Sequence, residues 1–83
     1  MRIREVFARN LRQLRAAKGI SQEELAYQAG LDRTYVSSLE RCRYSVSIDA
    51  LENLATALGT DESSLLRRPA PHARKGQRRS ESE

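Results

Sequence analysis

The chain has 83 residues, of which 39% are hydrophobic and 31% are charged, and a formal net charge of +4. This length allows one domain, and no apolar run approaches the roughly 18 residues of a membrane-spanning helix. The single cysteine excludes an internal disulfide, and the lone histidine argues against a structural zinc site. The first ten residues are charged and lack the apolar core of a signal peptide, so we expect a cytoplasmic protein.

The positive charge is confined to one end of the chain. Residues 1–66 contain nine Lys/Arg and nine Asp/Glu, whereas residues 67–83 contain six Lys/Arg and two Glu and no Leu, Ile, Val or aromatic residue. Because such a segment cannot bury enough apolar surface to offset its chain entropy, we predict an ordered domain over 1–66. We predict a basic disordered tail over 67–83, which would add salt-sensitive phosphate affinity.

The first predicted helix covers residues 3–18. Its apolar residues recur at intervals of three and four, as on one side of a helix; they are Ile3, Val6, Phe7, Leu11 and Leu14. Gly19 follows at the position of a left-handed C-terminal cap.

Ser21 opens a second predicted helix. Ser21 and Glu24 stand three residues apart, as in the capping box, where each side chain bonds the backbone N–H of the other residue. The apolar face is small, which lets a neighbouring helix cross close by; it consists of Leu25, Ala26 and Ala29. Gly30 ends the helix, because glycine adopts a positive φ without steric cost.

A third helix is predicted from about residue 33 to residue 41, with Asp32 as its N-cap. Val36 and Leu39 are expected to point inward. The outward face is polar and consists of Arg33, Thr34, Ser37, Ser38 and Arg41.

Two more helices follow a connector. Ser47 caps a fourth helix, which Gly59 ends, and its apolar stripe consists of Ile48, Leu51, Leu54, Ala55 and Leu58. Asp61 and Glu62 start a short fifth helix containing Leu65 and Leu66. No stretch alternates like a strand. The predicted fold class is therefore all-α, a compact bundle of five helices.

A helix, a short glycine-containing turn and a second helix with a polar outer face form the arrangement of many DNA-binding domains. This chain resembles the helix-turn-helix regulators of the lambda-repressor/Cro type, also called the XRE family. The resemblance spans about residues 3–66 and rests on the segments LRQLR at 11–15, SQEELA at 21–26, AGL at 29–31, VSSLER at 36–41 and LENLATALG at 51–59. The segment LDRTYVS at 31–37, with Glu40 and Arg41, is also similar to the small controller proteins of restriction–modification systems.

The resemblance implies a role for each matching residue in binding double-stranded DNA. Arg33, Thr34 and Ser38 match base-contacting positions of the family, and Gln22 matches a phosphate contact. We expect Ser37 to join the base contacts, and further phosphate contacts from Tyr35, Arg41, Arg43 and Tyr44. Arg15 and Glu40 match a pair that links the first helix to the end of the third and orients the reading helix. The simpler alternative is that the polar face of the third helix is only a solvated surface.

Cys42 departs from the family pattern, in which glycine is usual at the end of the third helix. If the backbone keeps a left-handed conformation there, a non-glycine residue costs something like 1 kcal/mol. The alternative is a remodelled turn, which would change the placement of Arg43 and Tyr44.

The sequence favours a transcriptional regulator that acts as a homodimer on a palindromic operator, with a dimer face including Leu58, Leu65 and Leu66. The alternative is an antitoxin-like module that neutralises a protein partner and controls its own operon. An enzyme is not expected, because the sequence offers no nucleophile–base set and no phosphate-binding glycine loop. We likewise expect no cofactor, no metal, no membrane partner and no small-molecule effector.

Overall fold

The computed structural model describes residues 1–69, which form five helices and, over that range, no strand. The helices are α1 (Ile3–Lys18), α2 (Gln22–Ala29), α3 (Arg33–Glu40), α4 (Ile48–Leu58) and α5 (Glu62–Leu66). The predicted all-α, five-helix architecture is confirmed.

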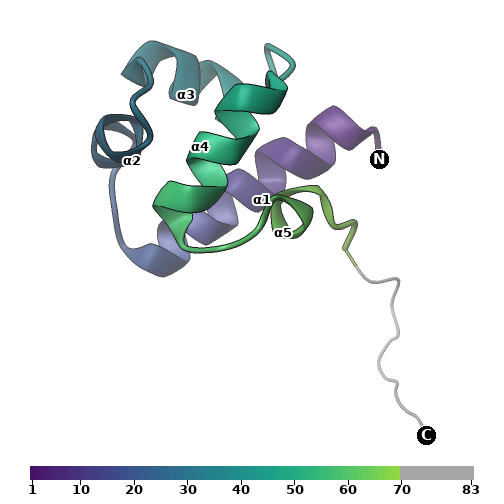
Figure 1. Cartoon of the computed structure of the whole chain (residues 1–83). Helices are drawn as coiled ribbons and strands as arrows, with labels where there is room; N and C mark the ends of the chain where they lie inside the picture. Colours follow the sequence, from purple (N-terminus) through teal and green to yellow (C-terminus); the bar gives the residue numbers. More distant parts are fainter. Residues whose placement is uncertain (70–83) are drawn as a thin grey trace, which may run out of the picture.

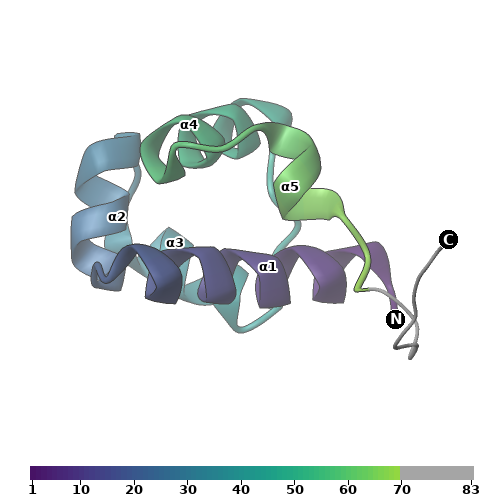
Figure 2. The same cartoon turned by 90° about the horizontal axis from the view of Figure 1, so that it is seen from below.

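The helices surround a single core. α1 and α4 run along opposite sides of the molecule, while α2 closes one end and α5 closes the other (Figure 2). α3 lies beside α2 and packs against both α1 and α2 (Figure 1). The inner side of α3 is therefore held by two helices, and its other side faces solvent.

The core is built from the apolar faces that the three- and four-residue spacings create. Its buried members are Phe7, Leu11, Leu25, Ala26, Ala29, Val36, Leu39, Leu51, Leu54, Ala55 and Leu65. Every helix contributes to this cluster, and burying one leucine or valine side chain contributes roughly 1.5–3 kcal/mol. Because Val36 and Leu39 are both almost completely buried, the rotation of α3 about its own axis is fixed by the core.

The turn between α2 and α3 is tightly specified. Gly30 has φ 69°, and Leu31 N–H donates to the Ala26 carbonyl at 2.8 Å. Asp32 then caps α3, with its Oδ1 accepting from Thr34 N–H at 3.3 Å. Glycine is favoured here because an L-residue with a Cβ is strained at positive φ, so the predicted turn residues act as expected.

Only half of the predicted capping box of α2 is formed. Ser21 Oγ accepts from Glu24 N–H at 3.0 Å, but Glu24 Oε2 accepts from the Gln28 side chain at 2.7 Å instead of turning back to Ser21. Gln28 lies four residues along the same helix face, so it competes for the carboxylate. The backbone N–H of Arg2, at the start of α1, does bond a carboxylate three residues ahead, that of Glu5.

The structure corrects the predicted dimer face at one residue. Leu65 is 0% exposed and belongs to the core, so it has no surface to offer a partner. Leu58 and Leu66 are half-buried and keep part of their surface. Neighbouring residues in a helix point about 100° apart, which is why Leu65 can be internal while Leu66 is not.

The residues that directly follow α5 are still hydrogen-bonded to the helical domain. The buried side chain of Asn10 donates to the carbonyl oxygens of Leu65 and Arg67, both at 2.9 Å, and Arg68 donates to the Met1 carbonyl. The predicted domain boundary at 66 therefore leaves out Arg67, which contacts α1, and Arg68, which contacts the N-terminal residue. Our predictions for the basic tail, from residue 70 to residue 83, lie outside the described residues.

Candidate nucleic-acid interface

The outer face of α3 is polar and carries positive charge. Arg33 and Thr34, the first two residues of the helix, are exposed. Ser37 and Ser38 lie one turn further on and are half-buried, and Arg41 is exposed at the C-cap. The only acidic residue in α3 is Glu40, which is 3% exposed. The accessible face of this helix therefore attracts anions.

The order of these residues along α3 suits DNA reading. In helix-turn-helix proteins the N-terminal residues of the second helix contact base edges. A guanidinium offers a planar fork that matches guanine O6 and N7, and a threonine offers a hydroxyl and a methyl group. Within residues 1–69 no side chain or carbonyl accepts a hydrogen bond from the Arg33 guanidinium, so it can bind an external acceptor without breaking an internal bond.

A buried carboxylate holds α3 in place. Glu40 Oε2 accepts from Arg15 Nε at 2.6 Å, and Glu40 Oε1 accepts from Arg15 Nη2 at 3.0 Å. The resulting fork joins the end of α3 to α1, as the resemblance implied. The hydrogen bond to Glu40 raises the pKa of Arg15 above its ordinary value, and burial lowers it less than the bond raises it.

The same network reaches the α1–α2 loop and α2. Arg15 Nη1 donates to the Ile20 carbonyl, and Gln22 Nε2 donates to Glu40 Oε1, both at 2.9 Å. Gln22, which the sequence placed at a phosphate, is thus turned partly inward, and one hydrogen of its amide group is already used. Glu40 therefore couples α1, α2 and α3 through three accepted hydrogen bonds.

Arg12 is a structural residue that the sequence reasoning missed. Its Nη1 donates to the backbone carbonyl of Glu40, at the C-terminal end of α3. Cations are stabilised at that end of a helix, where carbonyl groups have no partner within the helix. The spacing of three residues puts Arg12 on the same side of α1 as Arg15, but only the folded structure shows that this side faces α3.

Tyr35 has a different local role from the one the sequence assigned. Its side chain is half-buried against the core, and its hydroxyl oxygen accepts from Ser47 N–H at 3.3 Å. Tyr35 thereby connects α3 to the start of α4. The hydroxyl hydrogen can still be donated, so a phosphate contact stays a prediction for this residue.

Cys42 occupies the left-handed position expected for a glycine. Its φ is 59°, Cys42 N–H donates to the Leu39 carbonyl at 3.1 Å, and Arg43 N–H donates to the Ser38 carbonyl at 2.9 Å. These two bonds form a Schellman C-cap. The turn is therefore not remodelled, and Arg43 and Tyr44, which follow it, are exposed.

Replacing Cys42 by glycine is expected to stabilise the domain by about 0.5–1 kcal/mol. The substitution removes the strain of an L-residue in the left-handed conformation, which stabilises the folded state. Glycine also gives the unfolded chain more conformational freedom, and this offsets part of the stabilisation. Urea unfolding of wild type, Cys42→Gly and Cys42→Ala measures the effect. The alanine variant keeps a Cβ at positive φ and should not be stabilised; equal stabilisation by both variants would contradict the strain.

Two other kinds of site are absent from the part of the chain that the structure describes. Within residues 1–69, no three His, Cys, Asp or Glu side chains are grouped so as to hold a metal ion. Over the same range, no helix has the length and apolar character needed to cross a membrane.

Comparison with known proteins identifies relatives that are described as transcription factors or control proteins. The family model described as "Helix-turn-helix domain" matches residues 6–67. A protein described as a hypothetical transcription factor from Neisseria meningitidis is 51% identical over 67 residues, which are 81% of this chain and 63% of that protein. Control protein C.BamHI from Bacillus amyloliquefaciens is 43% identical over 65 residues, covering 77% of this chain and 80% of the relative.

Solved structures share the fold. The crystal structure of the Neisseria transcription factor superposes with a TM-score of 0.79 and 50% identity, covering 82% of this chain and 78% of that one. The restriction–modification controller protein C.AhdI from Aeromonas hydrophila superposes with a TM-score of 0.73 and 47% identity, covering 75% of this chain and 94% of that one.

Proposed function

Because the chain belongs to the helix-turn-helix family, we propose that it regulates transcription as a homodimer on a palindromic operator. Its relatives in that family are DNA-binding regulators and include restriction–modification controller proteins. α3 enters the major groove of each half-site. The proposal is carried by one observation: the exposed face of α3 begins with Arg33 and Thr34, and the only carboxylate of that helix is buried against Arg15.

The two sets of proposed contacts have different tasks. Arg33, Thr34, Ser37 and Ser38 read base edges, with Arg33 supplying the strongest discrimination because of its bidentate fork. Contacts to phosphates set the register of the protein on the duplex without reading sequence. They come from Arg41, Arg43 and Tyr44 beyond the end of α3, from the Tyr35 hydroxyl, and from the remaining amide hydrogen of Gln22 at the start of α2.

Selection of bound duplexes from a random pool, at two salt concentrations, tests the function. We expect a palindromic consensus with half-sites about one helical turn apart, since a two-fold dimer presents its two reading helices at that spacing. Affinity should fall with salt while the consensus persists. Binding that is salt-sensitive but yields no consensus would contradict a sequence-specific regulator.

The apolar surface near the start of α4 is the proposed dimer face. Ile48, the first residue of α4, is 81% exposed, and Ile3 at the start of α1 is 49% exposed. A hollow of about 150 Å³ nearby is lined by Ile3, Phe7, Val46 and Leu66 among others. Compared with the dimer face predicted from the sequence, the proposed face keeps Leu66, omits Leu65 and adds Ile48. Leu58 lies about 15 Å along α4 from Ile48, so it would be at the edge of the proposed face.

Replacing Ile48 by aspartate is expected to make the protein monomeric at micromolar concentration, because a charge in the centre of a self-complementary apolar face is repeated on both copies. Sedimentation equilibrium measures the mass. Tyr27→Asp is the matched control, since Tyr27 is 82% exposed on α2 and outside this face. A dimer that survives Ile48→Asp, or a one-to-one complex with an unlike protein through this face, would contradict the proposed dimer.

A further inference from the structure

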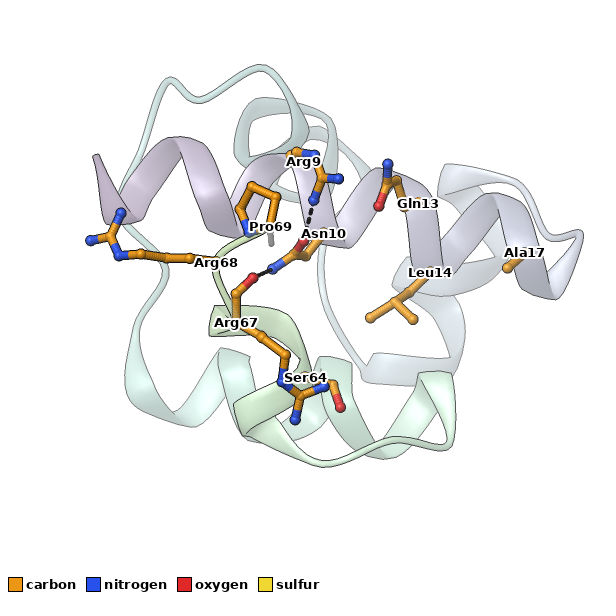
Figure 3. A pocket seen from close by; sticks show the side chains of 9 residues that line it. All are labelled: Arg9, Asn10, Gln13, Leu14, Ala17, Ser64, Arg67, Arg68 and Pro69. Carbon is orange, nitrogen blue, oxygen red and sulfur yellow. Dashed lines mark hydrogen bonds between the residues drawn. The ribbon is translucent and has the colours of Figure 1, made fainter. Parts of the chain in front are cut away.

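A groove separate from the DNA-facing surface lies between α1 and the segment from α5 to Pro69. Its volume is about 490 Å³. Figure 3 shows the residues that line it, among them Arg9, Asn10, Leu14, Ala17 and Arg67. Neither the family match nor the DNA-binding proposal assigns a role to this groove.

The groove lies on the side of α1 away from α3. Arg15 reaches α3 through Glu40, and Gln13 and Ala17 are each two residues from Arg15. At 3.6 residues per turn they project about 160° around the helix from it. A ligand in the groove would therefore leave the outer face of α3 free for DNA.

The buried side-chain amide of Asn10 joins the two walls of the groove and holds the Arg9 guanidinium at its rim. Asn10 is 7% exposed and ties α1 to the end of α5 through the Leu65 and Arg67 carbonyls. Its remaining oxygen, Oδ1, accepts from Arg9 Nη1 at 3.0 Å. One N–H group of the Arg9 guanidinium therefore bonds Asn10, and the other N–H groups have no acceptor within residues 1–69.

The charge of the groove has one sign. Among its lining residues, all of them within 1–69, there is no Asp or Glu. In Figure 3, Arg9 and Arg67 lie on either side of Asn10, and the Arg67 guanidinium lies near Ser64. The Arg68 side chain points away, toward the Met1 carbonyl that it bonds.

The Asp61 carboxylate, which the charge of Arg67 affects, already accepts hydrogen bonds from Ser63 and Ser64. Hydrogen bonds from Ser63 and Ser64 lower the pKa of Asp61, and the charge of Arg67 adds a smaller effect in the same direction. Asp61 does not line the groove. Arg67 therefore lines a groove whose own walls carry no carboxylate.

We propose that this groove binds a short acidic peptide segment of a protein partner, with carboxylates held by Arg9 and Arg67 and an apolar side chain over Leu14 and Ala17. Arginine suits this task because its fork matches a carboxylate bidentately. The proposal goes beyond DNA binding: a regulator bound to DNA through α3 would hold a second protein on its opposite side.

The length of the groove sets the size of the segment. Residues 9–17 of α1 extend over about 12 Å at 1.5 Å per residue. An extended peptide rises about 3.3 Å per residue, so roughly four residues fit along this wall. Two carboxylates separated by one or two residues can then meet the two arginines.

Fluorescence anisotropy with a labelled Asp-Glu-Leu-Glu-Asp peptide tests the proposal on the full chain. We expect saturable binding that Arg67→Glu weakens at least about tenfold. The control Arg2→Glu makes the same charge change on an exposed residue at the start of α1, outside this groove and outside the hollow of the proposed dimer face, and it should leave affinity within about twofold. The uncharged Asn-Gln-Leu-Gln-Asn peptide should not bind.

A second variant separates groove binding from general charge attraction. Ala17→Phe fills the groove from an exposed position without changing charge, and it should weaken the acidic peptide at least about tenfold. Equal weakening by Arg67→Glu and Arg2→Glu, no effect of Ala17→Phe, no binding by wild type, or displacement of the peptide by random-sequence duplex would each overturn the proposal. Binding of the selected operator by Ala17→Phe should match wild type, whichever way the peptide result falls.

Discussion

Replacing Glu40 by alanine is expected to destabilise the domain by about 3–5 kcal/mol, which is the cost of breaking a buried ion pair from one side. Glu40 is 3% exposed and accepts three hydrogen bonds from Arg15 and Gln22. Its removal leaves a partly buried guanidinium without its carboxylate. Domains of this size are stable by only about 0.05–0.15 kcal/mol per residue, so a large part of the folding free energy would be lost.

Urea unfolding followed by circular dichroism measures this loss. Glu52→Ala is the matched control, because Glu52 is an exposed carboxylate on α4 and surface substitutions of this kind usually change stability by less than about 0.5 kcal/mol. If Glu40→Ala costs no more than Glu52→Ala, the network does not fix α3.

The double substitution of Arg15 and Glu40 by alanine refines the same test. Once the carboxylate has gone, removing the guanidinium deletes a stranded charge, so the double variant should be more stable than the sum of the two single effects predicts. Additive effects would show that the two side chains act independently.

Replacing Arg33 by alanine is expected to reduce operator affinity by roughly 5- to 150-fold for each half-site, the range that a bidentate arginine–guanine contact contributes. The domain should stay folded, because Arg33 is exposed at the first position of α3 and makes no internal hydrogen bond within residues 1–69. The loss should be accompanied by relaxed sequence preference at one base position per half-site.

Anisotropy titrations on the selected operator and on single-base variants of it measure both effects. Arg43→Ala is the informative comparison: a phosphate contact should weaken all sequences about equally and lower the salt dependence. If Arg33→Ala also weakened every sequence alike, Arg33 would be a phosphate contact and the base-reading role would pass to Thr34 or the serines.

Local sequence signals predicted the fold because each has a local physical cause. The apolar spacing of α1, the N-caps Ser21 and Asp32, and Gly30 depend on residues within a few positions of one another. The Arg15–Glu40 pair spans 25 positions and was accessible only through the family resemblance.

Contacts made only by the folded chain were not predicted. Asn10 bonds carbonyls 55 and 57 positions away, and Arg12 bonds one 28 positions away. Nothing in a helical sequence marks which polar residue will face a distant helix end. The same limit explains the error at Leu65, because two adjacent leucines in a five-residue helix do not reveal which of them faces the core.

The placement of α3 in the major groove is tested most directly by methylation protection of guanine N7, an atom that lies in that groove. On the operator recovered by selection, wild-type protein should protect guanines in two symmetric half-sites about one helical turn apart, and Arg33→Ala should lose protection at one position in each. Protection that is absent from the major groove, or unchanged in Arg33→Ala, would contradict the account.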